Sequence, residues 1–196
     1  MIAKRAARRN DSRSSFAALA AYLLDADHCG AKVAFSRVTN CLAEDPGLAV
    51  KEIEATQALN RRTKNDKTYH LVVSFRAGER PTEAQLQDIE REVCEAIGLG
   101  EHQRLSALHT DTDNLHLHIA INKVHPRTRN CIEPYYDKYK LGDICRVLEL
   151  RHGLERDPHV GQHVLDASAH RAVGRSADME RHAGVESFRS LSLIHI

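Results

Sequence analysis

Alternation of apolar and polar residues along the chain predicts four β-strands. The clearest is the segment 115–124, where Leu115, Leu117, Ile119 and Ile121 form one continuous apolar face. The other three strands are expected at 32–39, 68–76 and 102–109. A short turn dense in Asp and Asn separates the last two strands, which predicts a β-hairpin.

Apolar residues at helical spacing predict four helices, at 16–25, 46–62, 82–98 and 140–151. A serine precedes the first helix, Pro46 stands in the first turn of the second, and Gly153 follows the last. The resulting order, α-β-α-β-α-β-β-α, favours an α+β fold. We expect a mostly antiparallel central sheet with helices packed mainly on one face.

The length of 196 residues suits one main domain, which we expect to span 1–155. The chain turns polar beyond Pro158, which predicts a weakly structured C-terminal extension over 156–190. Residues 191–196 match the translation of a transposon end used to prepare sequencing libraries. We therefore expect an artefact there and a natural protein that continues further.

The charge balance excludes a strongly basic coat, because 28 Lys and Arg face 27 Asp and Glu, a net charge of +1. Two local basic segments remain, an N-terminal arm and a loop after the last strand. They comprise Lys4, Arg5, Arg8, Arg9 and Arg13, and Lys123, His125, Arg127 and Arg129. Each segment either binds nucleic-acid phosphates or is a solvated surface.

The five cysteines are odd in number, widely spaced and without a Cys-x-x-Cys pair. This pattern favours a reducing compartment over a disulfide framework or a zinc ribbon. Neither a signal peptide nor a segment long enough to span a membrane is recognisable, so we expect a cytoplasmic protein without membrane insertion.

Histidine is abundant, with 13 residues, and three of them gather around the predicted hairpin. His116 and His118 share the face of the last strand opposite its apolar face, and His109 ends the partner strand. Three imidazole ligands leave coordination positions open, which is typical of a catalytic metal site. Imidazoles alone suit Zn, Mn, Ni or Co better than Mg.

Two carboxylates and one tyrosine complete the candidate chemistry. Asp111 and Asp113 lie in the turn of the hairpin, where either is able to orient a histidine or accept a proton. Tyr22 lies on the first predicted helix among small and aliphatic residues. It is either a packing residue or a nucleophile that attacks a phosphate beside the metal.

The His116-Leu117-His118 element is the hallmark of the HUH endonucleases. The wider string HTDTDNLHLHIAINKVHP, starting at His109, resembles the third motif of the MobA/TraI-type plasmid conjugative relaxases, the P class of mobilisation proteins. YHLVVSFRAGE resembles their second motif, with Ser74 as its serine, and FAALAAYLLD resembles the first, with Tyr22 as its tyrosine. The start of the chain and the stretch 178–188 also resemble IncP-type TraI relaxases.

The resemblance implies a palm-like HUH fold and an enzyme that nicks one DNA strand at a plasmid transfer origin and rejoins it. It implies Tyr22 as the nucleophile, Ser74 near the scissile strand, and Asp111 or Asp113 in support. The implied ligands of a divalent cation, Mg²⁺ or Mn²⁺, are His109, His116 and His118. The expected DNA-binding residues are Arg76, Asn122, Lys123, Lys4 and Arg5. Implied partners are single-stranded origin DNA, accessory proteins of the relaxosome and a coupling protein.

Two other functions remain open from the residues alone. One is a rolling-circle replication initiator of the same superfamily, although in typical initiators the tyrosine follows the histidine strand, whereas Tyr22 precedes it. The other is a non-catalytic module that binds DNA or a metal.

Overall fold

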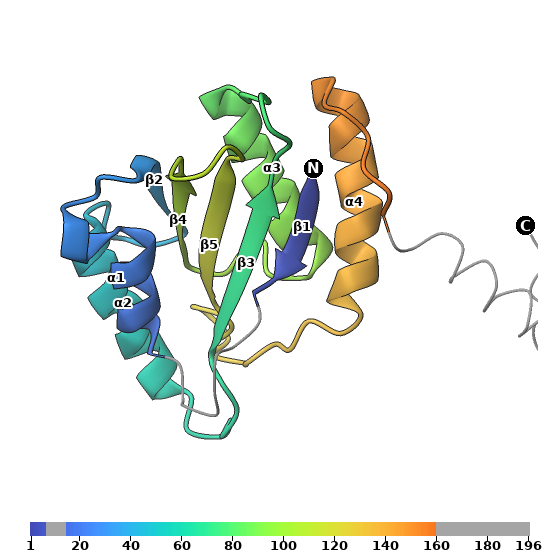
Figure 1. The fold of residues 1–196 in the computed structure, drawn as a ribbon. Coiled ribbons are helices and arrows are strands. Elements are labelled where there is room, and N and C mark those ends of the chain that lie inside the picture. The colour runs from blue at the N-terminus through green and yellow to red at the C-terminus, as the bar shows by residue number, and fades with distance from the viewer. Residues whose placement is uncertain (7–14, 160–196) are drawn as a thin grey trace, which may run out of the picture. The chain divides into compact units, whose positions relative to one another are not determined.

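The computed structural model describes residues 1–6 and 15–159, which belong to one compact unit. Its centre is a sheet of five antiparallel strands in the order β1-β3-β5-β4-β2 (Figure 1). The α+β class and the antiparallel sheet are therefore confirmed. The predictions for residues 160–190 and 191–196 lie outside the described residues, as do Arg8, Arg9 and Arg13 of the basic arm.

All four predicted strands are present, each slightly shorter than expected. They are β2 (Val33–Thr39), β3 (Thr68–Ser74), β4 (Arg104–His109) and β5 (His116–Asn122). The predicted hairpin is β4 and β5, in which His109 lies opposite His116. The strand β1 (Ile2–Arg5) was not predicted, because its four residues carry two charges and no clear apolar alternation. It pairs along β3 at the edge of the sheet.

The four predicted helices are α1 (Phe16–Leu23), α2 (Pro46–Leu59), α3 (Glu83–Ala96) and α4 (Asp137–His152). Side chains at their N-termini explain where the first three begin. Ser15 caps α1, Asp45 caps α2, and Thr82 forms a reciprocal capping box with Gln85 on α3. Helix α4 ends at Gly153, whose φ of 66° favours a residue without a side chain. A short 3₁₀ turn, η1 (Ala26–His28), follows α1.

The helices divide between both faces of the sheet, which corrects the expectation that they pack mainly on one (Figure 1). Helices α3 and α4 cover the face that carries Leu117, Ile119 and Ile121. Helices α1 and α2 cover part of the other face. The physical reason is that this second face also has apolar positions, Ala107 and Ala120 among them, which need a cover.

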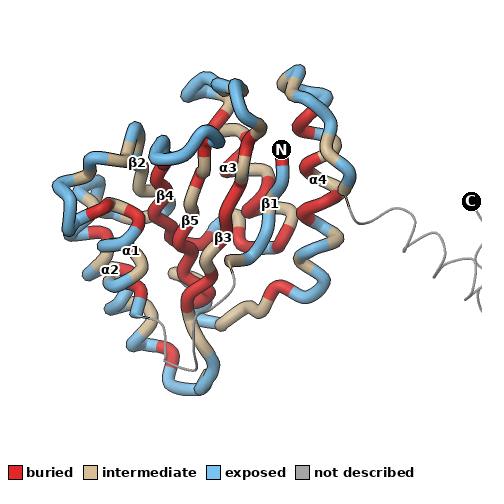
Figure 2. Tube along the Cα trace, viewed as in Figure 1, coloured by how far each residue is buried: buried red, intermediate tan, exposed pale blue. Residues whose placement is uncertain are grey.

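Two separate apolar clusters result, and the buried residues follow the strands (Figure 2). The larger cluster fills the space between the sheet and α3 and α4. The smaller cluster joins α1 and α2 to β4 and β5 through Phe16, Leu23 and Ile53. It fixes α1 against the strands that carry the histidines. In the described part of the chain, no helix is both long and apolar enough to cross a membrane.

Candidate active site

The register of the sheet brings the three predicted histidines together on the face beneath α1. His116 lies between His109 of β4 and Ser74 of β3, and His118 lies one pair further along β5. The ring centroids of His109 and His118 are 4.4 Å apart, and those of His116 and His118 are 6.2 Å apart. The alternation that predicted a shared face for His116 and His118 is therefore confirmed.

Hydrogen bonds fix one nitrogen of each of these three rings. The buried His109 donates from Nε2 to the carbonyl oxygen of Leu23 in α1, at 2.7 Å. Nδ1 of His116 lies 2.9 Å from Oγ of Ser74, and Nδ1 of His118 lies 3.1 Å from Nε2 of His70. Because a carbonyl only accepts, the proton of neutral His109 is on Nε2 and the lone pair is on Nδ1.

His70 is a fourth histidine of the cluster, which the sequence analysis did not single out. It lies on β3 directly opposite Ala120, on the same face as Ser74. The available signal was its spacing from Ser74 by an even number of residues in a predicted strand. Without the strand order, however, nothing in the sequence places β3 next to β5.

Burial keeps two of the four rings neutral at pH 7. It lowers the pKa of His118 to about 3, and the nearby His109, His70 and His116 lower it further through charge repulsion. Burial and His109 lower the pKa of His70 to about 4. Neutral imidazole is the form that donates a lone pair to a metal ion.

Tyr22 lies beside the histidines, in the last turn of α1. Its ring centroid is 6.0 Å from those of His109 and His118 and 6.4 Å from that of His70. The side chain is 52% exposed, so a substrate from solvent reaches it. The helix is anchored next to the cluster because Leu23, the neighbour of Tyr22, accepts the hydrogen bond from His109.

A lysine and an aspartate that the sequence analysis did not single out flank Tyr22. Nζ of Lys32 lies 5.0 Å from the centroid of the Tyr22 ring and 3.2 Å from Oδ1 of Asp25. Burial alone would raise the pKa of the Asp25 carboxyl, but hydrogen bonds with His28 and Lys32 hold it below its usual value. The hydrogen bond with Asp25 and the attraction of nearby acidic groups raise the pKa of Lys32. The positively charged ammonium of Lys32 therefore lies next to the ring of Tyr22.

The structure places Asp111 and Asp113 in the exposed turn between β4 and β5. Neither carboxylate is hydrogen-bonded to a site histidine in the described part of the chain. Asp111 acts on the site only through its charge, which contributes to the raised pKa of Lys32. The assignment of either residue to histidine support or proton transfer stays a prediction.

The chemistry of His109, His116 and His118 suits a divalent cation, but their nitrogen atoms do not converge on one point in this structure. Each of the three rings uses one nitrogen in a protein hydrogen bond, and among the described residues none of them is hydrogen-bonded to a carboxylate. Within residues 1–6 and 15–159, however, no three His, Cys, Asp or Glu side chains already meet in a metal-binding arrangement. The metal site thus stays a prediction supported by its donor chemistry.

The expected DNA-binding residues are widely separated, and several are engaged within the protein. Arg76 pairs with Asp157 and Glu155, and the buried Lys123 pairs with Glu133. Arg5 pairs with the same Glu133 and lies over the ring of Tyr69.

Asn122 and Lys4 differ in their exposure. Asn122 is fully buried and hydrogen-bonded to Gln103 and Val124. Lys4 is exposed in β1, opposite Val72 and therefore in the same row of the sheet as His118. Among the expected DNA contacts, Lys4 is therefore the one that is exposed on the same face of the sheet as the histidines.

Comparison with known proteins identifies relatives of this chain. The family model "Relaxase: MobA/VirD2-like, nuclease domain" matches residues 22–154. Two Escherichia coli proteins named TraI are 50% and 49% identical to the chain over 95% of its length. The protein MobA of Acidithiobacillus ferrooxidans is 43% identical over 68 residues, which is 35% of this chain and 17% of MobA. The chain spans about a quarter of the two TraI proteins, 24% and 25%.

Proposed function

Since the chain belongs to the MobA/VirD2-like relaxase nuclease family, we propose that it nicks one strand of DNA at a plasmid transfer origin and so initiates conjugative transfer. The observation that carries the proposal is the position of Tyr22, whose ring lies 6.0 Å from those of His109 and His118. A nucleophile beside a cluster of imidazoles suits the transfer of a phosphodiester.

The reaction is a transesterification. The phenol oxygen of Tyr22 attacks the scissile phosphorus and its proton passes to a base, while the bond from phosphorus to the 3′ oxygen breaks and that oxygen takes up a proton from the base or from water. The products are a 5′-phosphotyrosyl link and a free 3′-OH, and the reverse reaction rejoins the strand. A phenol in water has a pKa of about 10, so it needs help to ionise at pH 7. The ammonium of Lys32, 5.0 Å from the centroid of the Tyr22 ring, favours the negative charge that develops on the phenol oxygen as it loses its proton.

The predicted metal ligands are His109, His116 and His118. These residues would hold Mg²⁺ or Mn²⁺, which would supply positive charge to stabilise the negative charge of the scissile phosphate. The chain's own residues keep the rings in place: Leu23 holds His109, Ser74 holds His116 and His70 holds His118. We thus propose that Ser74 orients His116, in addition to its predicted place near the scissile strand.

The proposed substrate is the single strand of the transfer origin in a bacterial cytoplasm. Lys4, exposed in the same row of the sheet as His118, is a proposed phosphate contact. Asp111 and Asp113 lie in the turn that joins the strands of His109 and His116, and either is a candidate to accept the proton of Tyr22. Accessory proteins of a relaxosome and a coupling protein are the proposed partners.

A covalent adduct tests the function. The protein is incubated with single-stranded origin DNA and Mn²⁺, and the products are separated under denaturing conditions. We expect a protein–DNA adduct that disappears in Tyr22→Phe and persists in Tyr135→Phe and Tyr136→Phe, which alter two exposed tyrosines outside the site. Loss of the adduct in either control, with retention in Tyr22→Phe, would contradict the nucleophile. Metal binding without any adduct would favour a non-catalytic module.

A further inference from the structure

Three arginines line one cavity beyond the end of β5, at the opposite end of that strand from His116. Arg61 and Arg62 directly follow α2, and Arg129 comes from the loop after β5. The cavity has a volume of about 480 Å³ and no Asp or Glu among its lining residues. Its polar lining is completed by Asn60, Thr63, Thr128 and Asn130.

The walls of this cavity are fixed by hydrogen bonds. The buried Asn60 donates to the carbonyl oxygen of Arg129 at 2.7 Å and accepts from the backbone N–H of Thr63 at 3.0 Å. It thereby ties the turn after α2 to the loop after β5. Two backbone hydrogen bonds also hold the loop after β5 together. The N–H of His125 donates to the carbonyl oxygen of Asn130, and the N–H of Arg129 donates to the carbonyl oxygen of His125. Binding here needs little ordering of the backbone.

The end of a helix repels anions, but a lysine offsets this effect here. Nζ of Lys67 donates to the carbonyl oxygens of Gln57 and Asn60, at 2.7 and 2.5 Å. Two of the carbonyl groups at the C-terminus of α2 are thus already paired with a cation, which offsets part of the negative end of the helix dipole. The electrostatic potential in the cavity is therefore set mainly by the three arginines.

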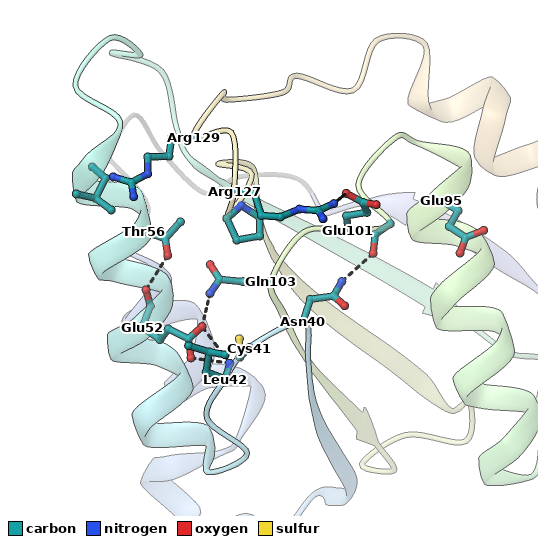
Figure 3. Close-up of a pocket in the computed structure, with 13 residues that line it drawn as sticks. Asn40, Cys41, Leu42, Glu52, Thr56, Glu95, Glu101, Gln103, Arg127 and Arg129 are labelled. Atoms are coloured by element: carbon teal, nitrogen blue, oxygen red, sulfur yellow. Dashed lines mark hydrogen bonds and ion pairs between the residues drawn. The ribbon is translucent and has the colours of Figure 1, made fainter.

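The guanidinium groups of these arginines are not hydrogen-bonded within the described residues, unlike those of their neighbours. In the same loop, Arg127 pairs with Glu101 at 2.6 Å. Figure 3 shows Arg127 pointing toward Glu101, while Arg129 points the other way, toward α2. The adjacent cleft in that figure, about 910 Å³, is also lined by Arg129, but it contains the carboxylates Glu52, Glu95 and Glu101, which repel an anion.

We propose that Arg61, Arg62 and Arg129 hold a backbone phosphate of the single DNA strand, away from the scissile phosphate. Guanidinium forks match phosphate oxygens in pairs, and a cavity without carboxylates adds no repulsion. The strand β5 separates the two sites, with about 13 Å from His118 to Asn122 at roughly 3.3 Å per residue. The identity of the ligand as DNA rests on the proposed function.

Binding of fluorescein-labelled single-stranded oligo(dT), followed by fluorescence anisotropy, tests this site. The variant with Arg61→Gln, Arg62→Gln and Arg129→Gln should bind roughly tenfold more weakly at low salt. Between about 50 and 200 mM salt, its slope of log K against log salt should be shallower by about 0.7, the value for one phosphate contact on a single strand. Arg127→Gln, in the same loop but already paired, should bind as the wild type does.

Equal affinity of the triple variant and the wild type would overturn the proposal, and so would an equal loss in Arg127→Gln. A loss confined to duplex DNA would overturn the assignment to a single strand. Circular dichroism checks folding, and the three single variants, each of an exposed arginine, replace the triple variant if it unfolds. The outcome is separable from the proposed function, because the wild-type adduct assay alone decides whether the chain cleaves DNA.

Discussion

Nε2 of His70 lies 3.1 Å from Nδ1 of His118, so a histidine of β3 sets the tautomer of a predicted metal ligand on β5. Both rings are neutral at pH 7, and therefore one nitrogen donates and the other accepts. Only when Nδ1 of His118 donates does its Nε2 keep a lone pair for a cation. A metal-competent site thus requires His70 as the acceptor.

Replacing His70 by alanine should weaken the metal dependence of cleavage. Loss of the acceptor frees the ring of His118 to turn and to change tautomer, so we expect roughly tenfold to hundredfold more Mn²⁺ for half-maximal adduct formation. His70→Gln, whose amide oxygen is also an acceptor, should restore part of the affinity. Titration of adduct formation with Mn²⁺ measures both variants. An unchanged midpoint in His70→Ala would contradict the role, and His125→Ala, outside the cluster, is the control.

Replacing Lys32 by methionine should slow adduct formation. The raised pKa of Lys32 keeps the ammonium charged from low pH through neutrality, so the wild type stabilises the Tyr22 phenolate across that range. Without the ammonium, no cation stands beside the charge that develops on the phenol oxygen, and we expect a rate lower by roughly tenfold to hundredfold at pH 7. Single-turnover rates across pH measure this effect. Lys32→Arg should stay close to the wild type, and a profile of Lys32→Met that coincides with it would refute the role.

Local patterns predicted most of the fold. The period-two alternation of β5, the serine that caps α1 and the proline that opens α2 act over a few residues, so the sequence carries them directly. The edge strand β1 was not predicted, because it forms by pairing with β3, a segment far away in the sequence. The placement of the helices also depends on packing between distant segments.

The candidate site divides in the same way. His116 and His118 were predictable from spacing, and Tyr22 from the resemblance to relaxases. His70 and Lys32 join the site through strand order and the turn after α1, which no short pattern encodes. Lys123 and Arg76 were expected to bind DNA. In the structure, however, Lys123 is paired with Glu133, and Arg76 is paired with Asp157.

Replacing Glu90 by alanine should strongly destabilise the fold. Glu90 and Arg104 form an ion pair of 2.7 Å, both nearly inaccessible to solvent, and the variant would leave the guanidinium buried without its carboxylate. We expect a loss of about 3 to 5 kcal/mol in the free energy of unfolding, measured by urea denaturation. Glu95→Ala, on the same helix, removes only an exposed pair with Arg91 and should cost about 1 kcal/mol or less. Equal losses in the two variants would contradict the argument.

Replacing Asp88 by asparagine should flatten the acid dependence of stability. Burial alone would raise the pKa of this carboxyl, but hydrogen bonds from Arg151, Arg91 and His152 hold it below 3.8. A carboxyl with a lowered pKa in the folded state stabilises the protein fully above its unfolded value and loses this contribution as the pH falls through the folded value. Unfolding free energies measured from neutral pH down to below 3.8 should therefore fall less steeply in Asp88→Asn. A parallel decline in the variant and the wild type would show that the contacts of Asp88 with α4 do not contribute to acid stability.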